Sequence, residues 1–397
     1  MTPPSTVPAL ARLEADFERF TRGLPRDFPD HVRGTYGIDL SARYLGVPVA
    51  HPIGKASGQL SLNAGQLEAD ARAGLAFAVL KTVIAQDETG AQAMAAWAIP
   101  ESRMTVERRR ARGGREGWTV TWKGRGWDRS LDEYLALVRA GRDLTRAGAL
   151  LVVPSAKYHL PRLGEPFRDA EYNYTTRALA GAWGEPPLLL EKDFSPTLAA
   201  DALAGDRAQV LRWLREVPAR LRAASPIALR LALKLMNARF DDAFQVEMLE
   251  TAAASGADAL VVCNRLFDAE QGVAYGGWDL SDRNLRALDT FVSSGRPPAP
   301  PSVRLTGTGN ICSGRLILEY ARRGCESVQL HTFFQLPLSE YPATAGSRTE
   351  RALHALVFDP RDGLIAGLLE LEGLGALARR GGELHFSDVV THAHHAR

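Results

Sequence analysis

The stretch Leu305-Thr306-Gly307-Thr308-Gly309-Asn310-Ile311-Cys312-Ser313-Gly314 decides the fold of this 397-residue chain. A β-like run, 302–305, precedes it, and a helix-like run, 315–323, and a second short strand, 327–332, follow it. Glycine lets backbone N–H groups approach an anion, and a helix N-terminus adds partial positive charge. In (β/α)8 barrels the loops after strands 7 and 8 often bind phosphate. Because the stretch lies late in the chain, we interpret it as such a loop, with a plain turn as the alternative.

The rest of the chain alternates short apolar runs with longer amphipathic runs, which is typical of βα units around a parallel sheet. Strands are predicted at 52–56, 76–82, 149–154, 187–192, 227–235, 259–264, 303–306 and 327–332. Helices are predicted at about 62–74, 131–147, 168–183, 200–223, 241–255, 281–294 and 313–323. Nothing marks a switch in strand order, so the α/β pattern predicts a (β/α)8 TIM barrel rather than an open sheet.

Three regions are expected: an N-terminal extension, 1–45, a barrel, 46–345, and a helical tail, 346–397. Residues 7–24 read as an amphipathic helix that covers the barrel floor, and Glu14, Asp16 and Glu18 make it too polar for a membrane anchor. The tail ends with His392, His394 and His395, which we interpret as a loose surface cluster rather than a metal site.

An insert, 85–130, separates strand 2 from the next helix. Its segment 118–122 alternates apolar and polar residues and predicts half of a β-hairpin. The insert is rich in arginine and projects from the face of a barrel where loops carry function. A lid that attracts an anionic substrate and a solvated charged hairpin are equally good interpretations, and nucleic-acid binding is a weaker one.

Composition sets further limits. The chain is 45% hydrophobic and 24% charged with a formal net charge of +2, so no general attraction to nucleic acid or anionic membranes is expected. Its three cysteines have neither disulfide nor metal spacing, no signal peptide is recognisable, and no apolar run could span a bilayer. These features predict a cytoplasmic protein without a metal centre.

Read together, these segments resemble the dihydroorotate dehydrogenase family of FMN-containing barrels over about 38–335. Residues 37–47 look like the strand-turn-strand ahead of that family's barrel, and 51–58, HPIGKASG, resembles its first strand. The resemblance implies that backbone around Ala56, Ser57 and Gly58 contacts the flavin ring.

Two lysines and an asparagine carry the resemblance further. Lys81-Thr82 ends strand 2, as in the soluble class 1 enzymes, which place a lysine near flavin and substrate there. Lys234 matches the family lysine near the flavin N1–C2=O edge, where a cation stabilises the reduced ring. Asn264 matches the strand-6 asparagine that contacts substrate and flavin.

The phosphate side of the resemblance lies in glycine-rich turns. Gly276 and Gly277 resemble the glycine pair after strand 6, and the opening stretch resembles the family's Gly-(Thr/Val)-Gly-Gly. Residues 329–332, QLHT, resemble its strand-8 motif. The resemblance implies FMN phosphate contacts from Gly307, Thr308, Gly309, Asn310, His331 and Thr332.

The substrate side matches less well. Ser195, before Pro196, falls on the family's base position, although a turn Ser-Pro is an equally good interpretation. Lys192 and Thr197 replace the asparagines that read the pyrimidine ring, and Arg265 replaces a small hydroxyl residue. Losing those amides should abolish recognition of that ring, and the new cations favour a more acidic or differently shaped ligand.

We therefore expect an FMN-dependent oxidoreductase of CH–CH groups that transfers hydride between flavin N5 and a small cyclic or carboxylate substrate, which is anionic and need not be dihydroorotate. Ser195, Lys81 and Lys234 would be catalytic, and Lys81, Lys192, Thr197, Asn264 and Arg265 would contact substrate. The resemblance also implies a homodimer and pyrimidine metabolism. Two alternatives stay open: a dihydrouridine synthase-like FMN enzyme acting on RNA, and a phosphate-ligand barrel without redox chemistry.

Overall fold

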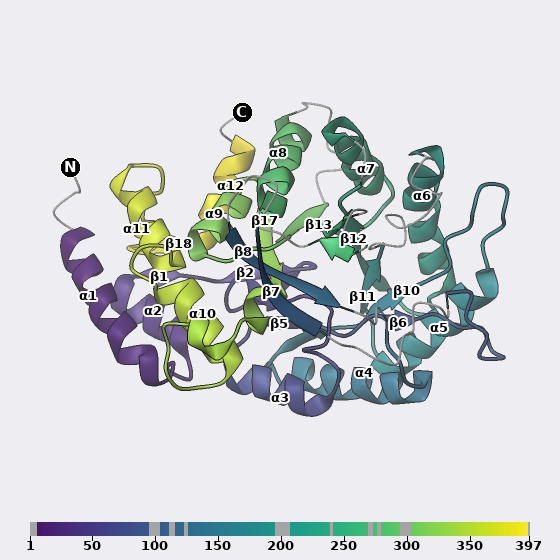
Figure 1. The fold of residues 1–397 in the computed structure, drawn as a ribbon, viewed down its shortest axis with the longest axis horizontal. Helices are drawn as coiled ribbons and strands as arrows, with labels where there is room; N and C mark the ends of the chain where they lie inside the picture. Colours follow the sequence, from purple (N-terminus) through teal and green to yellow (C-terminus); the bar gives the residue numbers. More distant parts are fainter. Residues whose placement is uncertain are drawn as a thin grey trace.

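The computed structural model describes residues 6–94, 104–110, 116–122, 126–194, 207–238, 241–268, 273–275, 279–293 and 303–395. Ser195, Thr197, Gly276 and Gly277 lie outside these residues. A parallel sheet forms the centre of the molecule (Figure 1). Its strands are β4 (Ile53–Lys55), β5 (Phe77–Val79), β6 (Val83–Ile84), β9 (Leu151–Val153), β10 (Ser155–Lys157), β11 (Leu188–Asp193), β12 (Leu229–Met236), β13 (Ala259–Asn264), β16 (Arg304–Thr308) and β17 (Cys325–Leu330).

The strand pairing makes this sheet curl back on itself. Its order is β6-β10-β11-β12-β13-β16-β17-β4-β5-β9. β6 directly follows β5 in the chain, and β10 directly follows β9. The ladder at one end of this order, β6–β10, and the ladder at the other end, β5–β9, therefore pair the same two chain segments, so the two ends of the sheet meet. This mixed α/β arrangement is compatible with a TIM-like barrel.

Helices follow the strands and surround the sheet in Figure 1. They are α3 (Ala64–Arg72), α4 (Leu131–Arg146), α5 (Asp169–Trp183), α6 (Arg207–Ala224), α7 (Asp242–Ala254), α8 (Asp279–Ser293) and α9 (Gly314–Ala321). Each predicted strand and helix of the repeat coincides with one of these elements, with ends that differ by a few residues. The start of the helix predicted at 200–223 lies outside the described residues, which resume at the first residue of α6. Side-chain caps fix several starts; for example, Ser130 and Glu133 form a capping box at α4.

The two ends of the chain pack together beside the barrel. The first part comprises α1 (Thr6–Arg19), η1 (Phe20–Arg22), α2 (Phe28–Tyr36), β1 (Ile38–Asp39) and the hairpin β2 (Ala42–Tyr44) and β3 (Val47–Val49). The last part comprises η4 (Phe333–Gln335), η5 (Leu338–Glu340), α10 (Arg348–Phe358), α11 (Leu364–Gly373), β18 (Leu384–His385) and α12 (Phe386–His395). Among the helices described, none is both long and apolar enough to cross a membrane.

The N-terminal helix does not reach into the barrel. The Phe17 ring of α1 stacks on His354 of α10, with ring centroids 4.6 Å apart. From the β2–β3 hairpin, Tyr44 enters the barrel instead and stacks on Phe77 at 4.1 Å. Tyr44 thus packs inside the barrel, and the expectation that the helix covers the barrel floor stays a prediction.

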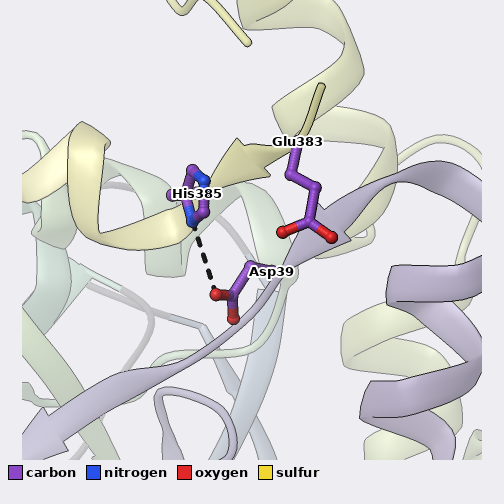
Figure 2. Close-up of side chains that lie close together, drawn as sticks. All are labelled: Asp39, Glu383 and His385. Atoms are coloured by element: carbon purple, nitrogen blue, oxygen red, sulfur yellow. Dashed lines mark ion pairs between the residues drawn. The ribbon is translucent and has the colours of Figure 1, made fainter. Parts of the chain in front are cut away.

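A cluster of Asp39, Glu383 and His385 joins β1 to β18 (Figure 2). Their ligand atoms lie within 4.8 Å of one another, close enough to hold a metal ion. However, Glu383 already accepts two 2.8 Å hydrogen bonds from Arg33, and Asp39 accepts one from the Ser41 amide. We therefore interpret the cluster as an ion-pair network that holds the chain ends together.

The basic insert forms the predicted hairpin. Its strands β7 (Met104–Arg110) and β8 (Glu116–Trp122) pair antiparallel and lie in front of the sheet in Figure 1. Arg108 of β7 pairs with Glu340 at 3.1 Å, and the Asn310 side chain donates to the Trp118 carbonyl at 3.4 Å. The hairpin is thus attached to the loops after β16 and β17. A second small hairpin, β14 (Leu266–Asp268) and β15 (Val273–Tyr275), follows β13.

Buried His51 should make stability depend on pH. Its Nδ1 accepts from the Ile53 amide at 3.2 Å, so Nε2 donates to the Gly74 carbonyl at 2.8 Å, and burial lowers its pKa from 6.5 to about 4. The unfolded chain therefore takes up this proton first. We expect the free energy of unfolding to fall by up to about 3 kcal/mol as pH drops from 6.5 towards 4.

Urea unfolding at several pH values tests this expectation against His51→Asn, whose side-chain oxygen can still accept from Ile53. The variant should lose less stability than the unmodified protein between pH 6.5 and 4. If the free energies of unfolding of the two proteins change with pH in parallel, His51 does not contribute to the pH dependence of stability.

Candidate functional site

Hydroxyl and carboxylate groups converge where several barrel strands end. The Thr82 hydroxyl lies 2.7 Å from Ser57 Oγ and 3.1 Å from Ser155 Oγ, and it donates to Asp193 Oδ2 at 3.3 Å. An ionised carboxylate only accepts, so the one hydrogen of Thr82 is directed to Asp193. Ser57 must then donate to Thr82, which leaves the lone pairs of the half-buried Ser57 oriented away from this chain of bonds.

Positive charges gather around this group. Lys157 lies 3.9 Å from Asp193 Oδ2, and both side chains are buried. Lys81 and Arg265 are buried as well, only 4% and 8% exposed. Burial, Arg265 and Lys157 together lower the pKa of Lys81 to about 8, while Asp193 and Asp128 act in the opposite direction. The end of the barrel thus holds more cations than carboxylates.

Lys81 is the most informative of these residues. It stands between β5 and β6, and its amide donates to the Ser61 carbonyl at 3.2 Å. No hydrogen bond or ion pair reaches its ammonium from any residue that the structure describes. A buried cation without a partner is costly, so this position favours an anionic ligand.

Lys192 faces away from this group. The alternation of β11 places Glu191 and Asp193 on one face and Lys192 on the other. Its ammonium donates to the Asp193 carbonyl at 2.9 Å and lies 4.5 Å from the Phe194 ring centre. Burial, with Lys157 nearby, lowers its pKa to about 7. The predicted substrate lysine therefore lies behind the strand, and Asp193 takes the place beside the other polar groups.

Lys234 lies inside the barrel. Its ammonium is 3.6 Å from Glu191 Oε1, and the two side chains are 2% and 0% exposed. Asn264, at the end of β13, is half-buried, and its backbone carbonyl accepts from both the amide and the side chain of Asn237. Ala56 follows β4 and donates its amide to the Leu330 carbonyl at 2.9 Å.

The glycine-rich loop after β16 is shaped by packing. A Cβ on Gly307 would overlap the Tyr320 ring, and one on Gly309 would overlap the Asn284 side chain. Gly309 and Asn310 have φ of 112° and 60°, values that favour glycine and asparagine. The Thr308 hydroxyl donates to the Gln329 carbonyl at 2.8 Å. Packing, backbone conformation and hydrogen bonding within the protein therefore explain these residue types, whether or not a ligand binds here.

The N-terminus of α9 is likewise engaged. Ser313 caps it by accepting from the Leu316 amide, and the Arg315 amide donates to the Asp362 carbonyl at 3.0 Å. Half-buried Thr332 stands at the start of η4, where its carbonyl accepts from the Gln335 amide. Of the two predicted phosphate segments, the one after β17 thus lies beside a short turn rather than a long helix.

His331 packs directly on Gly58, because a Cβ there would overlap the imidazole. Burial, followed by the charges of Arg265 and Lys81, lowers the pKa of His331 well below its usual value, so the ring is neutral. Gly58→Ala should push this ring aside and destabilise the fold by about 1–3 kcal/mol. Gly34→Ala is the matched control, since Gly34 is exposed in α2 with nothing within 4 Å of a Cβ.

Urea unfolding of the two variants checks this contact. The control should gain about 0.5–1 kcal/mol from the lower entropy of the unfolded chain. Equal stability of the two variants would mean that the imidazole moves without cost.

Sequence reasoning missed several residues of this site. Ser155 and Lys157 follow the third barrel strand, and Asp193 ends the fourth. The signal for Asp193 was its two-residue spacing from Glu191, which marks one face of a strand. Nothing comparable singled out Lys157, because its strand is short and buried throughout.

Comparisons with known proteins support the fold. No protein-family model matches the chain, and no curated protein matches its sequence. Among solved structures, the crystal structure of DHODH in complex with ferulenol from Eimeria tenella superposes with a TM-score of 0.59 at 13% identity. The match covers 96% of this chain and 95% of that chain. The chain therefore has a DHODH-like fold.

Proposed function

We propose that this protein is an FMN-dependent oxidoreductase that transfers hydride between a small anionic substrate and the flavin. The observation that carries the proposal is Lys81, a buried side chain whose ammonium receives no hydrogen bond or ion pair from any described residue, set among Arg265 and Lys157 where the strands of a DHODH-like fold end. Such a position suits a carboxylate-bearing substrate, since a charge-assisted hydrogen bond would satisfy the ammonium.

The available donors fit FMN. Lys81, Lys234 and half-buried Asn264 supply cationic and amide donors for a flat, electron-rich ring. Ala56 and Ser57 carry only small side chains, whereas the His331 imidazole packs on Gly58. The loops after β16 and β17 would hold the phosphate. When bound, FMN supplies hydride acceptance at N5.

The chain's own residues then have separate tasks. Lys81 and Arg265 bind and orient the substrate carboxylate. Ser57 presents its lone pairs, accepts a proton, and passes its own through Thr82 to Asp193. Ser195, outside the described residues, stays a second candidate for the base.

The substrate would differ from dihydroorotate, because Lys192 and Thr197 replace the asparagines that read its ring in the family that the sequence resembles, and Lys192 faces away from the site. A cytoplasmic location and a homodimer complete the proposal. The location rests on the cysteines, which lack disulfide spacing, and the homodimer rests on the family resemblance.

The visible absorption spectrum of the purified protein tests the cofactor. We expect flavin bands, FMN release on denaturation, and anaerobic bleaching by a small carboxylate, with dihydroorotate tried first and bleaching slowly or not at all. A colourless protein that takes up no added FMN would contradict the proposal. It would favour an anion-binding barrel without redox chemistry.

A further inference from the structure

Two buried ion pairs lie at different depths inside the barrel. Lys157 and Asp193 form the upper pair, and Lys234 and Glu191 form the lower one. The β11–β12 register places Lys234 opposite Asp193, whereas Glu191 stands opposite Ala232. Lys234 therefore reaches back along its neighbour strand, away from the strand ends, to pair with Glu191.

Glu191 is held from the far side. Its Oε2 accepts from Gln329 Nε2 at 2.7 Å and from the Tyr44 hydroxyl at 3.2 Å. Gln329 Nε2 also donates to Tyr44 at 2.8 Å, and the Tyr44 ring is fixed by stacking on Phe77. Burial and the charge of Glu191 raise the pKa of Tyr44, so the phenol remains a donor.

In this arrangement the carboxylate of Glu191 fixes the position of the Lys234 ammonium. Two hydrogen-bond donors and the Lys234 ammonium surround the Glu191 carboxylate, and the bonds from Tyr44 and Gln329 hold it on the side away from the strand ends. Seen from a ligand there, the Lys234 charge is largely compensated by the carboxylate below it. Lys81, in contrast, has no such partner among the described residues.

We infer that Glu191 is a positioning residue that holds the Lys234 ammonium inside the barrel and limits the positive charge that this lysine offers to the cofactor. The inference rests on the proposed function, because it concerns bound FMN. It assigns to the Tyr44–Gln329–Glu191 network the control of how readily the flavin is reduced.

Glu191→Gln should release that charge. The uncompensated ammonium would stabilise the reduced, more negative flavin, so the midpoint potential should become more positive. At a fixed dye potential we expect the ratio of reduced to oxidised flavin to rise roughly tenfold. Lys234→Met should shift the ratio in the opposite direction.

The test compares FMN-loaded proteins by equilibration with a reference dye. It includes Glu191→Gln, Lys234→Met, the double variant and a control, Glu171→Gln, which changes a buried carboxylate of α5 that accepts from the Ala93 amide. If Glu191 acts through Lys234, the double variant should have the potential of Lys234→Met, and the control that of the unmodified protein.

Several outcomes would overturn the inference. One is a flavin-bearing Glu191→Gln protein with unchanged potential, and another is the same shift from Glu191→Gln in both lysine backgrounds. If Glu191→Gln does not fold, the comparison of the double variant with Lys234→Met decides: equal potentials support the inference, unequal ones contradict it. Failure of the proposed function looks different, since the unmodified protein would then bind no FMN.

Discussion

Lys81→Met should weaken the binding of small dicarboxylates such as succinate or fumarate by about 100-fold. In the unmodified protein the side chain is buried and no described residue gives its ammonium a hydrogen bond or ion pair, so an incoming carboxylate would supply the first one. Losing one partner of a buried charged hydrogen bond costs about 2–5 kcal/mol. The thioether keeps the length of the side chain and removes only the charge and its hydrogen bonds.

Isothermal titration calorimetry across pH provides the measurement. Because burial and neighbouring cations lower the pKa of Lys81 to about 8, affinity should be constant below that pH. Above it, affinity should fall as the ammonium loses its proton, while binding to Lys81→Met stays flat. Lys192→Met is the matched control, since that buried lysine faces the other side of β11. Equal affinities of Lys81→Met and the unmodified protein for the dicarboxylate would contradict an anion-binding role of Lys81.

Lys55→Met should destabilise the fold by about 3–5 kcal/mol, the usual result of breaking a buried ion pair from one side. Lys55 of β4 pairs with Asp70 of α3, and both are buried. Asp70 Oδ1 also accepts from Thr349 of α10 at 2.8 Å, whereas Oδ2 makes no hydrogen bond with any described residue. Without the lysine, a buried carboxylate would keep only one hydroxyl partner.

The double variant Lys55→Met/Asp70→Leu separates charge from packing. Burial lowers the pKa of Lys55 and raises that of Asp70, so desolvation opposes the charged form of each partner. Removing both charges should therefore restore most of the stability lost in the single variant. Urea unfolding gives both values. A double variant no more stable than Lys55→Met would mean that the pair contributes mainly by packing.

The repeating part of the fold could be predicted from the sequence because each strand is a short apolar run between longer amphipathic ones. The β7–β8 hairpin was only half predictable. Segment 118–122 alternates apolar and polar residues, but its partner β7, MTVERRR, carries a run of charges that hides the alternation. Pairings between distant segments, such as β1 with β18, leave no local pattern to read.

At the site, the sequence identified which segments meet but not which way their side chains face. Lys192 and Asp193 are adjacent, and only the register of β11 decides that the carboxylate joins Thr82 while the lysine lies behind. The same limit applies to Gly307, because a glycine required by the Tyr320 ring reads like one required by a phosphate. The pairing of Lys234 with Glu191 depends on side-chain reach between strands, which no spacing encodes.

The β1–β18 pairing also affects how the protein is made. Ile38 emerges from the ribosome long before Leu384, so β1 waits unpaired through most of translation. An exposed strand edge invites pairing with other nascent chains, but a strand as short as Ile38–Asp39 offers little surface for it. The partner of β1 is therefore among the last segments to be synthesised. A chain stalled before Leu384 would lack β18 and would leave β1 without its strand partner.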